Sequence, residues 1–80
     1  MSRARDVVEV IARALASRPE DVRATQVESR GTTIVELFMA PGELGRVIGR
    51  QGRTAAAIRT LATAAGEIDG ARVSVEFVDD

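Results

Sequence analysis

One stretch of ten residues constrains the fold of this 80-residue chain more than any other. It reads Gly45-Arg46-Val47-Ile48-Gly49-Arg50-Gln51-Gly52-Arg53-Thr54, with three glycines and three arginines. Glycine-rich backbone brings N–H groups close to an anion, because no Cβ atoms stand in the way. A helix that begins directly after such a turn directs its positive N-terminal end to the same point. The stretch therefore predicts an anion-binding turn between two helices.

Hydrophobic periodicity predicts six elements in the order α-β-β-α-α-β. The predicted helices cover Arg3–Ser17, Glu43–Ile48 and Arg53–Ala65, and the predicted strands cover Val22–Ser29, Thr32–Ala40 and Ala71–Val78. Pro19 favours the end of the first helix near Arg18, and residues 66–70 are expected to form a loop. Arg30-Gly31 is typical of a hairpin turn. Irregular alternation in the first strand predicts a bulge or a weak edge strand.

The apolar spacing also predicts which side chains face inward. The inward positions expected in the helices are Val7, Ile11 and Leu15, with Val8 and Ala12 beside them, in the first, Leu44, Val47 and Ile48 in the second, and Ile58, Leu61, Ala62 and Ala65 in the third. Val35, Leu37 and Met39 are expected to share one face of the second strand, and Val73, Val75 and Phe77 one face of the last. Phe38 lies on the opposite face of its strand, where we expect packing and not base stacking.

The order of elements defines a topology. From Thr32 to Val78 the chain runs strand, helix, helix, strand, and a crossover of that length returns the second strand parallel to the first, with a right-handed connection. The hairpin adds an antiparallel strand. We therefore expect a single α+β domain over residues 1–80, with a three-stranded mixed sheet and three helices on one face.

Composition excludes several classes of function. The chain contains no Cys, His, Tyr or Trp, which excludes disulfides and thiolate metal sites and removes the commonest general base and zinc ligand. We expect no catalysis, no cofactor and no metal site. There is no apolar run near the ~20 residues of a membrane span and no basic-then-apolar leader, so a cytoplasmic location is expected.

Charge is distributed unevenly along the chain. The formal net charge is −1, yet residues 43–59 hold four arginines against Glu43 alone. Arginine is well suited to planar, bidentate contacts with phosphate. The positive excess therefore lies on and around the glycine-rich turn, which favours a phosphate as the anion.

A lone G-x-x-G is weak evidence for an anion-binding loop, because its glycines can simply permit a sharp corner between two helices. The residues around the motif therefore decide between these two interpretations. Val47-Ile48-Gly49-Arg50-Gln51-Gly52, followed by Ala55 and Ile58, resembles the signature of the KH domain, whose G-x-x-G loop (here residues 49–52) clamps about four nucleotides of single-stranded nucleic acid. The element order resembles the type II, prokaryotic variant. Nearly the whole chain, most strongly residues 41–62, is similar to the small stand-alone bacterial KH-domain RNA-binding proteins.

The resemblance implies a role for each residue of the turn. Gly49 and Gly52 would leave room for a sugar-phosphate backbone, and Arg50 and Gln51 would contact phosphate or sugar. Arg46 and Arg53 would add positive field, and Thr54 would bond a phosphate or cap the following helix. Four apolar residues would form a floor for bases or simply core: Val47, Ile48, Ala55 and Ile58, with core favoured for Ile48 and Ile58. Arg59 is interpreted as a solvated charge, and a role for Arg72 is left open.

The resemblance further implies a non-catalytic single-stranded RNA-binding protein, a bacterial RNA chaperone or post-transcriptional regulator. It also implies a homodimer, or a heterodimer with a second RNA-binding protein that carries KH and R3H domains. The alternative is a protein-interaction module with a KH-like fold that no longer binds RNA. The acidic pI near 5.4 and the small Ala55 in the expected groove favour that alternative.

Overall fold

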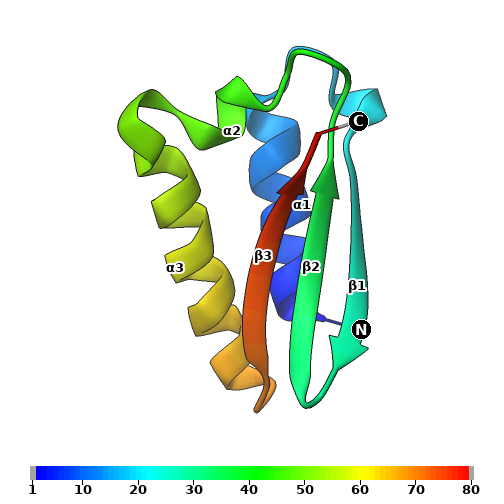
Figure 1. The fold of residues 1–80 in the computed structure, drawn as a ribbon, viewed down its shortest axis with the longest axis vertical. Helices are drawn as coiled ribbons and strands as arrows, with labels where there is room; N and C mark the ends of the chain where they lie inside the picture. Colours follow the sequence, from blue (N-terminus) through cyan, green and yellow to red (C-terminus); the bar gives the residue numbers. More distant parts are fainter. Residues whose placement is uncertain (1, 80) are drawn as a thin grey trace.

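The computed structural model describes residues 2–79 and contains the six predicted elements in the predicted order (Figure 1). They are α1 (Arg3–Leu15), β1 (Arg23–Ser29), β2 (Thr32–Phe38), α2 (Gly45–Ile48), α3 (Arg53–Ile68) and β3 (Arg72–Val78), with single 3-10 turns η1 (Pro19–Asp21) and η2 (Arg50–Gly52). Ser2 caps α1, because its hydroxyl accepts a hydrogen bond from the Arg5 backbone N–H at 3.1 Å. Among these residues, no helix has the length and apolar character that crossing a membrane requires.

The three strands form one sheet in the order β1-β2-β3. β1 pairs antiparallel with β2, and β2 pairs parallel with β3. Figure 1 shows α1 behind the sheet and α3 beside β3, so that the helices lie on one face and leave the other face open. The predicted α+β fold, with a three-stranded mixed sheet, is confirmed.

The β1–β2 hairpin is regular. Both turn residues have positive φ, 51° at Arg30 and 81° at Gly31, as the primed turns of two-residue hairpins require. Pairing runs without a break from Arg23 opposite Phe38 to Ser29 opposite Thr32. The expected bulge in the first strand is therefore wrong, whereas its position at the edge of the sheet is confirmed.

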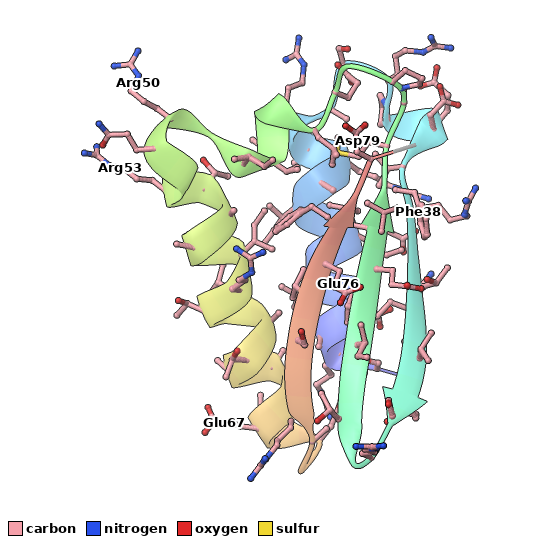
Figure 2. The ribbon with its side chains drawn as sticks, in the orientation of Figure 1. Phe38, Arg50, Arg53, Glu67, Glu76 and Asp79 are labelled. Carbon is pink, nitrogen blue, oxygen red and sulfur yellow. The ribbon has the colours of Figure 1, made fainter. Side chains whose placement is uncertain are left out.

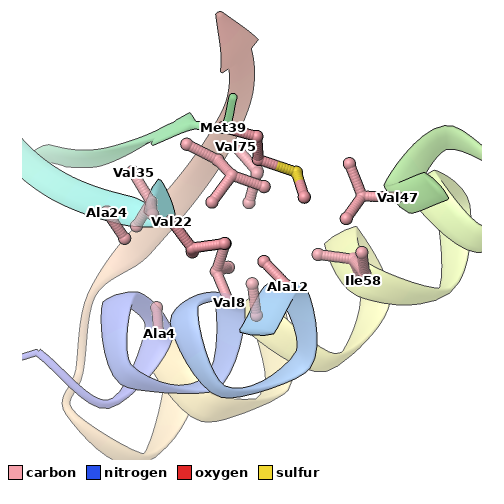
Figure 3. Close-up of a cluster of buried hydrophobic side chains, with 12 residues drawn as sticks. Ala4, Val8, Ala12, Val22, Ala24, Val35, Met39, Val47, Ile58 and Val75 are labelled. Carbon is pink, nitrogen blue, oxygen red and sulfur yellow. The ribbon is translucent and has the colours of Figure 1, made fainter. Parts of the chain in front are cut away.

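The core lies between the sheet and the helices (Figure 3). Its largest fully buried side chains are Leu37, Ile58, Val8, Val35 and Val47. α1 contributes Ala4, Val8 and Ala12, so that Val8 and Ala12, which were expected beside the stripe of Val7, Ile11 and Leu15, are its fully buried members. Val7 and Ile11 are half-buried, and Leu15 is 38% exposed. Small alanines allow α1 to lie close to its neighbours, which explains why the narrower stripe is the buried one.

Two further residues predicted to face inward are exposed instead. Leu61 on α3 is 51% exposed and Ile48 at the end of α2 is 38% exposed. Their neighbours Ala62 and Val47, which were also predicted to face inward, are fully buried, so the buried face of each helix is narrower than predicted. The core interpretation of Ile58 is confirmed, and that of Ile48 is wrong.

Several element ends also differ from the sequence prediction. α1 ends at Leu15 because Ala16 is extended, with ψ 145°. α2 begins at Gly45 and not at Glu43, and β2 ends at Phe38 although Met39 and Ala40 are buried. α3 continues through Gly66 to Ile68, where a loop was predicted. Gly66 is buried against β3, so close to it that an added Cβ would lie 2.3 Å from Val73 Cγ2.

Candidate nucleic-acid interface

The glycine-rich turn has a backbone that few residues could adopt. Gly49 ends α2 with φ 74° and ψ 175°, a region that is essentially restricted to glycine. Gln51 follows with φ 58° and ψ 23°, and Gly52 with φ 72° and ψ 14°, both left-handed. The Gly52 N–H donates to the Gly49 carbonyl at 3.2 Å. The turn is therefore closed by a hydrogen bond of its own backbone, and its shape depends on both glycines.

The Thr54 side chain packs against Gly49 at the start of this turn. A Cβ at Gly49 would lie 2.3 Å from Thr54 Oγ1 and 2.8 Å from Thr54 Cβ, whereas a Cβ at Gly52 would meet nothing within 4 Å. The N-cap of α3 is Gly52, with no side-chain capping bond. The expectation that Thr54 caps this helix is therefore wrong, because Thr54 already lies inside its first turn. A contact of Thr54 with phosphate stays a prediction.

Two arginines extend from the turn into solvent. Figure 2 shows Arg50 and Arg53 pointing away from the sheet at the start of α3. Arg53 Nη2 donates to Gln51 Oε1 at 3.0 Å. Across residues 2–79, neither arginine has a carboxylate within ion-pair distance. Their charge is therefore available to an external anion, next to the positive end of α3.

Arg46 differs from these two because it has a partner. Its Nε donates to Glu43 Oε2 at 3.0 Å, and its side chain remains 53% exposed. The same carboxylate also accepts hydrogen bonds from Ser17 and Arg18, in the segment that follows α1. The Ser17 hydroxyl, helped by the two backbone N–H groups and Arg46, holds the pKa of Glu43 below its ordinary value, although burial opposes this. In the sequence, Glu43 is distinguished only as the single acid of residues 43–59.

A second carboxylate ties the far end of α3 to the start of α1. Asp69 accepts a hydrogen bond from the Arg3 backbone N–H at 3.0 Å and also pairs with the Arg3 guanidinium. The backbone bond is the main reason that the pKa of Asp69 lies below its ordinary value. Within residues 2–79, no group of three or more acidic side chains is arranged to hold a metal ion.

The remaining predicted residues divide into core and outlying positions. Val47, Ala55 and Ile58 are buried, as core residues are, and only Ile48 of the expected floor reaches the surface. Arg59 is not simply solvated, since its guanidinium lies 4.9 Å from the centre of the Phe77 ring and so bridges α3 and β3. Arg72 starts β3 opposite Thr32, beside the hairpin. It therefore lies at the other end of the sheet from the turn (Figure 1).

Comparison with known proteins agrees with this geometry. The family model described as "KhpA/KhpB, KH domain" matches residues 5–77. The chain is 44% identical over 79 residues to the RNA-binding protein KhpA of Aquifex aeolicus, covering 99% of this chain and 100% of that one. It is 46% identical over 70 residues to the KhpA of Leifsonia xyli, covering 88% of this chain and 90% of the relative.

A solved structure shares the fold at low sequence identity. The crystal structure of a variant of Aquifex aeolicus Era bound to GDP and AlF4⁻ superimposes with a TM-score of 0.64 at 20% identity, over 96% of this chain and 31% of the Era chain. At 20% sequence identity this match is evidence for the fold alone. The family match over residues 5–77 and the relatives of nearly equal length together carry the assignment: this chain belongs to the KhpA/KhpB family of KH-domain proteins.

Proposed function

We propose that this chain is a non-catalytic single-stranded RNA-binding protein that grips the sugar-phosphate backbone with the G-x-x-G loop at residues 49–52. The observation that carries the proposal is the turn itself, which combines the glycine-restricted backbone of Gly49 with the free arginines Arg50 and Arg53. Relatives of nearly equal length are named RNA-binding protein KhpA. The proposed setting is the bacterial cytoplasm, with a role as RNA chaperone or post-transcriptional regulator.

In this proposal, the residues of the turn have different roles in RNA binding. Gly52, with open space where a Cβ would stand, leaves the turn accessible to a sugar-phosphate chain, whereas Gly49 allows the turn to pack against Thr54. Arg50 and Gln51 contact phosphate or sugar. Arg53 and Arg46 add positive charge on either side, and the Thr54 hydroxyl lies within the turn. Three or four contacts of this kind give weak, salt-dependent binding that is largely indifferent to base sequence.

A double substitution that reverses the sign of the charge at the loop tests the proposal. Arg50→Asp/Gln51→Asp replaces the positive field by a negative one and keeps both glycines. Aspartate tolerates the left-handed conformation of residue 51, so the fold should survive. We expect RNA affinity in a filter-binding or fluorescence-anisotropy assay with a short single-stranded RNA to fall below detection. Unchanged helical circular dichroism and thermal midpoint would show that folding is intact.

A matched variant controls for net charge. Arg30→Asp/Gln26→Asp makes the same two replacements in the β1–β2 hairpin, where Arg30 also has a positive φ of 51°. It should retain most of the RNA affinity. If the loop variant binds RNA as well as this control, the RNA-binding proposal fails.

The second candidate is a protein-interaction module. The observation that favours it is the exposure of large apolar side chains on the helices: Val10 is 67% exposed, Leu61 51% and Ile68 70%. The same side chains support the proposal that the protein self-associates or pairs with a KH/R3H-domain partner, which would add RNA-binding sites and raise avidity. The folded loop variant separates the two functions, since unchanged RNA affinity in it would favour the interaction module. Analytical ultracentrifugation of the parent protein tests self-association, which is expected under both.

A further inference from the structure

Glu43 is the only charged residue among the buried residues of the described chain, with 8% of its surface exposed. A carboxylate offers about four acceptor positions, and all four are occupied here. Oε1 accepts from the backbone N–H groups of Ser17 at 2.8 Å and Arg18 at 3.2 Å. Oε2 accepts from the Ser17 hydroxyl at 2.8 Å and from Arg46 Nε at 3.0 Å.

Donors other than Arg46 fix the orientation of this carboxylate. Three of the four donors belong to the segment after α1, and two of them are backbone groups that have little freedom to move. Arg46 therefore binds an acceptor whose direction is set from outside its own helix. A charged hydrogen bond of this kind is about twice as strong as a neutral one, so it holds the arginine stem in one orientation.

The use of Nε leaves the outer edge of the guanidinium free. Arg46 carries five N–H donors in a fixed fork, and the structure uses the single donor on Nε for Glu43. The two terminal nitrogens remain, on a side chain that is 53% exposed. A planar group held at one edge presents the other edge as a bidentate phosphate ligand with less rotamer entropy to lose.

We propose that Glu43 is a positioning residue for RNA binding, which anchors Arg46 by its Nε so that the terminal nitrogens of that guanidinium meet a phosphate beside the G-x-x-G loop. This inference rests on the proposed RNA-binding function. Glu43 itself touches no RNA and would, by charge alone, repel it. Its effect on affinity must therefore pass through Arg46, and this dependence can be measured.

A double-mutant cycle tests the dependence. We expect Glu43→Gln to weaken RNA binding about twofold to threefold at 0.1 M salt. Arg46→Ala should weaken it about fivefold, because one lost phosphate contact changes the slope of log K against log salt by about 0.7, which amounts to about 0.7 in log K at 0.1 M relative to 1 M salt. Glu43→Gln should change nothing further when Arg46 is already alanine. A merely structural role of Glu43 would weaken binding equally in both backgrounds, and that result would overturn the inference.

The control for charge is Glu20→Gln, which removes one negative charge from an exposed residue of the neighbouring turn η1. It should bind RNA as tightly as the parent or slightly more tightly. If Glu43→Gln binds as tightly as Glu20→Gln, Glu43 positions nothing and the inference fails. If Arg46→Ala has no effect while Arg50→Asp/Gln51→Asp abolishes binding, the inference fails and the proposed function stands.

A second substitution covers the case in which Glu43→Gln does not fold. Arg46→Lys keeps the charge but has one nitrogen, which cannot serve Glu43 and also present a free fork to phosphate. We expect the change in log Kd caused by Arg46→Lys to be at least half as large as the change caused by Arg46→Ala. Full retention of affinity by the lysine variant would overturn the inference.

Discussion

At the scale of single residues, the two glycines of the G-x-x-G loop are not equivalent. Gly49 has a glycine-restricted backbone and lies against Thr54, whereas Gly52 is left-handed with open space around it. We predict that Gly49→Ala costs about 3 kcal/mol of unfolding free energy or more, since backbone strain of about 1–3 kcal/mol adds to overpacking of about 1–3 kcal/mol. Gly52→Ala should cost only about 1–2 kcal/mol. Urea denaturation of both variants measures the difference.

A third variant checks the cause. Gly49→Ala/Thr54→Ala removes the Oγ1 atom that the new Cβ would meet at 2.3 Å but keeps the Thr54 Cβ position at 2.8 Å. It should therefore recover only part of the loss. Equal costs for Gly49→Ala and Gly52→Ala would contradict the structure of the turn.

At the scale of elements, close packing of α3 against β3 sets the position of the helix that begins at the loop. Gly66 lies inside α3, and a Cβ there would lie 2.3 Å from Val73 Cγ2 and 3.2 Å from the Ala71 carbonyl oxygen. Gly66→Ala gains about 1 kcal/mol of helix propensity and loses about 1–3 kcal/mol by overpacking. We predict a net destabilisation of up to about 2 kcal/mol, measured as a shift in the urea midpoint.

Removing the opposing side chain should reverse this result. In a Val73→Ala background the Cγ2 atom is absent, so Gly66→Ala should be neutral or slightly stabilising. If the alanine at position 66 destabilises both backgrounds by the same amount, its cost arises from the backbone near Ala71 and not from contact between α3 and β3.

Periodicity predicts elements well and contacts poorly in this chain. The order of helices and strands follows from apolar spacing and turn residues, and the site residues of the turn follow from their unusual composition. Apolar spacing gives α1 one broad apolar side, and only packing against the neighbouring elements decides that Val8 and Ala12, and not Val7 and Ile11, are fully buried. A glycine directly after the last periodic residue usually marks the end of a helix. The packing of Gly66 inside α3 could therefore not be predicted from the sequence.

The role of Glu43 could not be predicted for a different reason. Its partners Ser17 and Arg18 lie about a third of the chain away, and no local pattern brings them together. The Arg59–Phe77 contact likewise joins two elements that only the fold places side by side. Contacts between residues distant in the sequence depend on the packing of whole elements, which spacing within one element does not specify.

At the scale of the whole molecule, an acidic protein has three exposed arginines beside the G-x-x-G loop: Arg46, Arg50 and Arg53. The net charge is −1, and ion pairs with acidic partners involve Arg3, Arg5, Arg13, Arg18 and Arg46. Of the arginines outside these ion pairs, Arg50 and Arg53 lie at the loop, with Arg46 held beside them by Glu43, whereas Arg30 and Arg72 lie at the other end of the sheet (Figure 1). The acidic remainder repels polyanions elsewhere, so an RNA strand should be drawn to the loop and contact few phosphates.

The salt dependence of RNA binding measures how many phosphates are contacted. Each neutralised phosphate of a single strand contributes about −0.7 to the slope of log K against log salt, so three or four contacts predict a slope of roughly −2 to −3. Titrations with a short single-stranded RNA between 50 and 500 mM salt, roughly the range over which counterion release is measured, would give this slope. A slope near zero would mean that the arginines of the loop do not bind phosphate. A slope steeper than about −5 would require more contacts than these arginines provide, and would place the RNA on additional basic residues such as Arg30 and Arg72 at the far end of the sheet.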